Sequence, residues 1–193
     1  MRLETIVILV IILFVGGFFL NAVGVINTDL DDQILSPSIS AVEKEIENYI
    51  YNYTNTERAT YGLSSLQYDP VLSDIARSHS LDMATNNYFS HTNLQGFGPS
   101  DRAEKAGYST YKSLGDGWYT NGIGENIFKM PYGNVEGVGY VGKYDSNKIA
   151  YEIVDGWMNS PGHRANILES DYTKIGVGVS YNDGYYYATQ DFW

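Results

Sequence analysis

Cysteine is missing from all 193 residues of the chain. Its absence excludes disulfide bonds, thiol nucleophiles, iron–sulfur clusters and thiolate zinc sites together. Histidine is scarce, with three residues, and 12 Lys and Arg stand against 23 Asp and Glu. The net charge of −11 repels phosphate backbones, so nucleic acid is not expected as a partner. Any chemistry must therefore use imidazole, carboxylate, hydroxyl and amide groups.

Charged residues are also few, at 18% of the chain, whereas apolar residues reach 44%. This composition is typical of a folded body with a hydrophobic core rather than of a disordered or coiled-coil chain. The length predicts one domain plus a tail, because compact domains cluster near roughly 100 to 150 residues. We expect the folded domain to be monomeric.

An unusually apolar segment opens the chain. Ile6–Leu20 contains no polar side chain, and Asn21–Ile26 extends it toward the length of a bilayer span. It predicts a cleaved signal peptide or an uncleaved signal anchor, with a buried core helix of a cytosolic protein as the third alternative. Arg2 is offset by Glu4, which weakens the positive start of a signal peptide and favours a hydrophobic anchor helix. Both export alternatives place the folded part outside the cytoplasm.

Three parts follow from this pattern: a signal anchor or signal peptide over 1–26, a linker over 27–39 and a folded domain over 40–193. Within the domain, apolar spacing and end signals predict helices over Val42–Gly62, Asp69–Asn87, Pro99–Ala106 and Lys148–Asn159. Pro70 at a first helical position supports the second helix, and Pro161 with Gly162 is expected to end the last.

The strands are predicted mainly at the end of the chain. Apolar residues alternate with glycine and serine in Ile175–Tyr181, and an Asn-Asp-Gly turn separates this segment from Tyr185–Trp193, which predicts a closing β-hairpin. Gly107–Asn147 is rich in glycine and tyrosine and is expected to be mostly loop, with a strand near Ile123–Phe128. Helices combined with hairpin-paired strands indicate an α+β layered fold with an antiparallel sheet.

The three histidines differ in their surroundings. His79 lies on the apolar face of a predicted helix, where a hydrogen-bonded core histidine is the common outcome. His91 and His163 are expected on irregular backbone near helix ends, where functional groups are often displayed. Glu125 lies between Gly124 and Asn126 on a predicted strand, so its carboxylate can face a cleft.

Two histidines and one carboxylate match the ligand set of an open zinc site. The paired HExxH spacing is absent, so spacing alone indicates the site only weakly. A serine hydrolase is an alternative because Ser160 lies three residues before His163, but no GxSxG turn is present to expose the hydroxyl. A hydroxyl bonded to local backbone is the commoner role for such a serine.

Several motifs together resemble a known family. In order they read YDPVLSDIARSHSLDMATNNYFSHT, GPSDRAEKAGY, GENIF, DGWMNSPGHRANIL and YTKIGVGVSYNDGYYYATQDFW. This order is similar to that of a prokaryotic CAP domain, from the superfamily of cysteine-rich secretory proteins, antigen 5 and pathogenesis-related proteins (SCP-like extracellular proteins). The resemblance spans about Ser40 to Trp193. It implies a three-layer α-β-α sandwich with a central antiparallel sheet, in a protein that is secreted or tethered to a membrane.

The resemblance also implies a central cleft with two histidines and two acidic residues, which can hold Zn²⁺ or another divalent ion. By motif, this chain supplies His91 in YFSHT, Glu125 in GEN and His163 in PGHR. These three are the candidate catalytic and metal-binding residues. The second acidic residue would follow Trp157 by three positions, where this chain has Ser160. The disulfides of eukaryotic members are absent as well.

Two functions follow as hypotheses. The first is an extracellular binding module for a lipid, glycan or other cell-envelope ligand, attached to the membrane through its N-terminal segment. The tyrosine-rich segment Tyr108–Tyr144 could line its cleft. The second is a divalent-metal-dependent, peptidase-like hydrolase that uses the same cleft, with Glu125 as a ligand or general base. A purely structural polar cluster is the third possibility.

Overall fold

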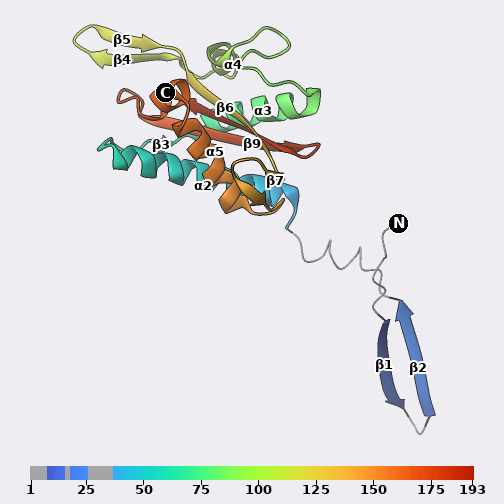
Figure 1. Cartoon of the computed structure of the whole chain (residues 1–193). Helices are drawn as coiled ribbons and strands as arrows, with labels where there is room; N and C mark the ends of the chain where they lie inside the picture. Colours follow the sequence, from blue (N-terminus) through green and yellow to red (C-terminus); the bar gives the residue numbers. More distant parts are fainter. Residues whose placement is uncertain (1–7, 16–17, 26–36) are drawn as a thin grey trace. The chain divides into compact units, whose positions relative to one another are not determined.

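Figure 1 shows a computed structural model of the chain, in which residues 8–15, 18–25 and 37–193 are described. Contacts divide the chain into two units, Met1–Ser38 and Ile39–Trp193. In the first unit, strands β1 (Ile8–Val15) and β2 (Phe18–Val25) pair antiparallel.

The expected N-terminal hydrophobic helix is not confirmed. The described residues of the segment 1–26 form β1 and β2, and its other residues lie outside the described part, as does most of the linker 27–39. Both strands are rich in β-branched and aromatic residues, which favour extended backbone. Among the described residues, no helix has the length and apolar character that crossing a bilayer requires.

The second unit contains the four predicted helices and one more. The predicted helices are α2 (Ile39–Thr60), α3 (Pro70–Asn86), α4 (Pro99–Lys105) and α5 (Ser146–Met158). Asp69 caps α3 as expected, because its side chain accepts hydrogen bonds from the amides of Val71 and Leu72 at 3.0 and 3.2 Å. The left-handed conformation of Asn87, with φ 52°, ends α3.

The additional helix is α6 (Pro161–Ile167), and it corrects the expectation that His163 lies on irregular backbone. Pro161 ends α5 but also begins α6, since a proline at the first position of a helix lacks only an N–H that the helix leaves unpaired there. Ser160 is the N-cap residue of α6 and makes no side-chain capping bond.

The central sheet has the order β3-β9-β10-β6, with β3 (Gln67–Tyr68), β9 (Lys174–Asn182), β10 (Tyr185–Phe192) and β6 (Gly124–Pro131). The closing hairpin is confirmed as β9 and β10. The sheet is mixed rather than purely antiparallel, because β3 pairs parallel to β9. This short strand lies in the connection from α2 to α3, which runs along the sheet edge in the same direction as β9. The sequence did not predict the strand, because two residues are too few to show an alternation of apolar and polar side chains.

Gly107–Asn147 is largely paired, so the expectation of mostly loop is wrong. It contains the hairpin β4 (Tyr111–Gly115) with β5 (Trp118–Asn121), and the hairpin β7 (Gly133–Val135) with β8 (Gly139–Val141). Asp116 and Gly117 connect β4 to β5 with φ of 49° and 83°. Positive φ at both residues is typical of a two-residue hairpin turn, and Asp-Gly is its sequence signal.

Helices cover both faces of the sheet (Figure 1). α2 and α5 pack on one face, where alternate residues of β9 and β10 join their apolar side chains in the main core around the buried Trp157. α3 packs on the opposite face, directly against β9 and β10. It approaches the backbone of β9 closely, because Gly176 and Gly178 present no side chain toward it.

Side chains of the helices close both edges of the sheet. Along β9, the amides of Val177, Val179 and Tyr181 donate to Ser73, Glu47 and Glu43. Along β6, the carbonyls of Glu125 and Ile127 accept from Asn166 and Trp157 at 3.1 and 3.0 Å. These bonds satisfy edge groups that would otherwise pair with another strand, and they attach β6 to α5 and α6.

Candidate functional site

Glu125 on β6 is the centre of a buried polar cluster. Its side chain is only 1% exposed and accepts two hydrogen bonds. His91 donates from Nδ1 to Oε1 at 2.7 Å, and Arg102 on α4 donates from Nη2 to Oε2. Both carboxylate oxygens are therefore occupied by partners from the same chain, and the guanidinium balances the negative charge.

Arg102 and His79 together position the loop that carries His91. Arg102 donates from Nη1 to the carbonyls of His91 and Phe97 at 2.8 and 3.0 Å. The buried ring of His79 bonds through Nε2 to the carbonyl of Ser90 at 3.0 Å. Since this carbonyl is an acceptor, Nε2 carries the proton. Burial lowers the pKa of His79, so its ring is a neutral structural donor next to the site.

His91 is the member of the cluster that reaches solvent, with its side chain 49% exposed. Because Nδ1 faces Glu125, the opposite ring nitrogen Nε2 points away from the carboxylate. Within the described residues, no hydrogen-bond partner of Nε2 is found. The result is an exposed imidazole whose orientation is set by a buried carboxylate, an arrangement that fixes which nitrogen meets a ligand.

His163 on α6 lies near His91 but does not join the hydrogen-bonded cluster. Burial, followed by the charge of His91, lowers the pKa of the His163 ring. Asn126 donates to the carbonyl of His163 at 3.1 Å, and Asn166 donates to the carbonyl of Glu125. These amides attach the middle and the end of α6 to β6, and so bring His163 to the side of the site as a neutral ring.

Asp191 on β10 is directly opposite Glu125 in the strand register. Its side chain is fully buried, and burial, followed by the negative charge of Glu125, raises its pKa well above the usual range. One guanidinium, that of Arg102, faces two carboxyl groups. Asp191 is thus favoured as a neutral acid, and among the described residues neither of its side-chain oxygens has a hydrogen-bond partner.

Of the three candidates from the sequence, His91 and Glu125 are in contact and His163 lies nearby, whereas sequence reasoning did not identify Arg102 or Asp191. The motif GPSDRAEKAGY contains Arg102, yet nothing in its local spacing links it to Glu125. Asp191 is found only from the pairing of β6 with β10. His79 has the hydrogen-bonded core role that was expected of it, although its partner is the loop that carries the site.

The donor set does not fit the expected three-ligand Zn²⁺ site. Glu125 uses both oxygens for His91 and Arg102, and Ser160 stands where a second acid was sought. In the part of the chain that the structure describes, no group of three or more His, Asp or Glu side chains is arranged to hold a metal ion. A Ser160–His163 hydrogen bond, which a serine hydrolase would need, is also not found among these residues.

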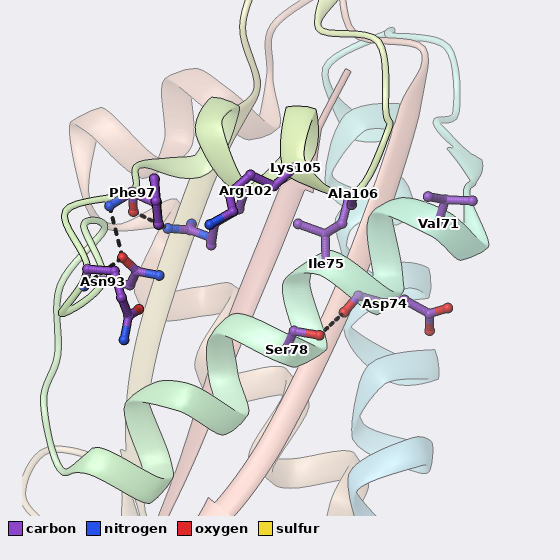
Figure 2. A pocket seen from close by; sticks show the side chains of 10 residues that line it. Val71, Asp74, Ile75, Ser78, Asn93, Phe97, Arg102, Lys105 and Ala106 are labelled. Carbon is purple, nitrogen blue, oxygen red and sulfur yellow. Dashed lines mark hydrogen bonds between the residues drawn. The ribbon is translucent and has the colours of Figure 1, made fainter.

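A pocket of about 630 Å³ lies beside the cluster, between α3, α4 and the loop at residues 93–97 (Figure 2). Val71 and Ile75 line it from α3, Phe97 from the loop, and Arg102 and Lys105 from α4. Figure 2 shows Arg102 reaching toward the carbonyl of Phe97. Arg102 therefore belongs both to the wall of this pocket and to the Glu125 cluster. The tyrosine-rich segment 108–144 contributes no residue to this pocket.

The end of α6 is held by Arg58 on α2. This buried guanidinium donates to the carbonyls of Ser64, Ile167 and Glu169 at 2.9, 2.7 and 2.8 Å. It joins α2 to the loop after α6, more than 100 residues away along the chain. The position of His163 therefore depends on Arg58 as well as on the amides of β6.

We expect Arg58→Met to lower the free energy of unfolding by about 3 kcal/mol, because three carbonyls lose a charged donor inside the fold. Urea unfolding followed by circular dichroism measures the change. Arg164→Met is the matched control: among the described residues this exposed arginine bonds only to the hydroxyl of Tyr61, whose ring it also covers, and a loss below about 0.5 kcal/mol is expected. An equal loss in both variants would contradict the anchoring role of Arg58.

Comparison with known proteins places this chain in a family. The sequence model of the cysteine-rich secretory protein family, CAP, matches residues 51–192. The chain is 38% identical over 141 residues to the uncharacterized protein YkwD of Bacillus subtilis (strain 168), covering 73% of this chain and 43% of YkwD. It is 36% identical over 151 residues to the uncharacterized membrane protein YlbC of the same strain, covering 78% of this chain and 35% of YlbC.

A solved structure supports the same assignment. The crystal structure of an extracellular protein containing an SCP domain from Bacillus anthracis str. Ames aligns with a TM-score of 0.58 and 28% identity, covering 91% of this chain and 46% of that one. The chain thus spans less than half the length of each of these three relatives. The family model and the identity to YkwD establish that the chain belongs to the cysteine-rich secretory protein (CAP) family.

Proposed function

We propose that this chain is an extracellular binding module, secreted or tethered to a membrane, whose ligand contacts the exposed His91 imidazole. Two relatives support the location: one is described as an extracellular protein with an SCP domain and another as a membrane protein. The apolar N-terminal sequence supports export as well.

The observation that carries the proposal is the half-exposed ring of His91 above a buried, charge-balanced carboxylate. Glu125 and Arg102 hold this ring in one orientation before any ligand arrives. A preorganised polar group loses little conformational freedom on binding, which favours recognition over purely structural use. In the neutral ring, the Nδ1–H bond to Glu125 leaves Nε2 as a hydrogen-bond acceptor.

The charges favour a neutral, hydroxyl-bearing ligand, such as a cell-envelope glycan. The chain carries a net charge of −11, which repels anionic lipid surfaces and anionic polymers. The cluster's one buried cation, Arg102, is already paired with Glu125. A hydroxyl group can donate to Nε2 of His91 without requiring another charge. A lipid ligand would need an uncharged head group with a hydroxyl that donates to Nε2 of His91.

The test is binding of the full chain, purified in detergent, to isolated cell-wall glycan. We expect His91→Ala and Glu125→Gln each to weaken binding at least about tenfold, because one removes the contact and the other its orientation. His163→Ala tests the neighbouring ring, and Asn52→Ala on the outer surface of α2 is the control. Unchanged binding in the His91 and Glu125 variants, together with lower thermal stability, would instead assign the cluster a structural role.

A hydrolase is the second candidate, and the His91–Glu125 pair is what favours it. A carboxylate that orients an imidazole is the usual support of a general base. The metal-dependent version needs a third ligand that Glu125 does not offer while both its oxygens are engaged. Turnover of peptide, ester or glycan substrates that is lost in His91→Ala and Glu125→Gln would favour the hydrolase. Binding without turnover would favour the module.

A further inference from the structure

The carboxylate at the centre of the site has a counter-ion from its own chain. The Arg102 guanidinium contacts Oε2 of Glu125, while Oε1 accepts from His91. A carboxylate and a guanidinium form a strong, charge-assisted pair, and here both are almost fully removed from water, at 1% and 10% exposed. The pair is therefore electrically balanced without a bound ion.

Arg102 is also unable to leave this position easily. Its Nη1 donates to the carbonyls of His91 and Phe97, so the guanidinium connects the loop to Glu125 through three bonds. Moving it aside would leave two carbonyls and a buried carboxylate without their donor. The cation is thus part of the folded loop rather than a mobile surface charge.

A divalent ion would find few ligands here. An open zinc site uses three protein ligands, whereas the imidazoles of His91 and His163 are the two rings near the solvent-exposed side of the cluster. Both oxygens of Glu125 already accept hydrogen bonds, and Ser160 occupies the position where the family resemblance implies a second acidic residue. An ion that recruited Glu125 would also have to displace, or lie beside, a fixed positive charge.

We propose that Arg102 takes the place of a divalent cation in this site, so that the chain recognises its ligand without Zn²⁺. Arg102 acts as a positioning residue: it neutralises Glu125, holds the loop and leaves His91 as the contact group. The inference rests on the proposed function only for the identity of the site.

The test is calorimetric titration of the full chain with ZnCl₂ in detergent, with no organic ligand present. For the wild type we expect no binding that depends on His91 at Zn²⁺ concentrations up to about 100 μM. For Arg102→Met, which removes the charge but keeps much of the side-chain volume, we expect affinity for Zn²⁺ to rise at least about tenfold, since Glu125 becomes available. The double variant Arg102→Met/His91→Ala should lose this affinity again.

Arg102→Lys is the matched control, because it keeps a positive charge beside Glu125 and should bind Zn²⁺ as weakly as the wild type. If Arg102→Met does not fold, Arg102→Gln takes its place, and the wild-type titration decides the main point by itself. Stoichiometric, micromolar binding of Zn²⁺ by the wild type that is lost in His91→Ala would overturn the proposal. Unchanged affinity in a folded Arg102→Met or Arg102→Gln variant would overturn the role of Arg102. Either result leaves the glycan-binding test unaffected, so the two proposals fail separately.

Discussion

Gly178→Ala is expected to unfold the second unit or to lower its melting temperature by about 10 °C or more. A β-carbon at this position would lie 2.0 Å from the amide nitrogen and 2.2 Å from the Cα of Arg77, both in the backbone of α3. A helix backbone cannot yield as the end of a flexible side chain can. We therefore expect a loss of at least about 3 kcal/mol, a large part of the total stability of a domain of this size.

Thermal unfolding followed by circular dichroism measures this loss, and Gly162→Ala provides the control. Gly162 lies in α6, where an added β-carbon meets no atom within 4 Å, so this variant should melt within a few degrees of the wild type. A Gly178→Ala variant that melts as the wild type does would mean that α3 does not pack on β9 as closely as described. The same helix carries His79, so the loop with His91 depends on this packing as well.

The wild type is expected to lose folding stability as pH rises above about 4, and the Asp191→Asn variant is expected to lack this loss. The folded-state pKa of Asp191 is raised by burial and by Glu125, and lowered to a smaller extent by Arg102. Above the unfolded-state pKa, near 3.9, the unfolded chain has released this proton while the folded chain still holds it. Stability therefore falls as pH rises, by up to about 1.4 kcal/mol per pH unit, until Asp191 ionises in the folded state too.

Asparagine cannot ionise, and its amide carries donors as the protonated acid does. The variant should match the wild type near pH 3 and become progressively more stable than it toward pH 7. Urea unfolding of both proteins at several pH values measures the difference. Asp183→Asn in the turn between β9 and β10 is the control, because this exposed residue should leave the pH profile unchanged. Parallel profiles for the wild type and Asp191→Asn would contradict a raised pKa.

The elements that the sequence predicted well depend on neighbouring residues. The side chain of Asp69 and the ring of Pro70 begin α3 through contacts within three residues, so the start of that helix is visible in the sequence. The hairpin of β9 and β10 follows from its alternation and from Asp183 and Gly184, both with positive φ. The same turn signal is present at Asp116 and Gly117, but the strands on either side are short and almost entirely exposed.

The exposure of β4 and β5 explains why their sequences do not alternate between apolar and polar residues. Their residues are almost all exposed, and Trp118 is 75% exposed, so no buried face imposes a period of two. The helix α6 was missed for a different reason, since Pro161 can end one helix and begin another, and seven residues are too few to show a helical period. Both errors come from elements too short to bury a recognisable face.

By itself, the sequence determined the N-cap of α3, the closing turn, the absence of thiol chemistry and the residues His91, Glu125 and His163 as candidates. These depend on residue type or on neighbours a few positions apart. Only the tertiary structure decided that Arg102 neutralises Glu125 and that Asp191 lies opposite it. Those contacts join residues 23 and 66 positions apart through the docking of α4 and the register of β6 with β10. No local pattern encodes such pairings, because they arise only when the separate elements pack into one fold.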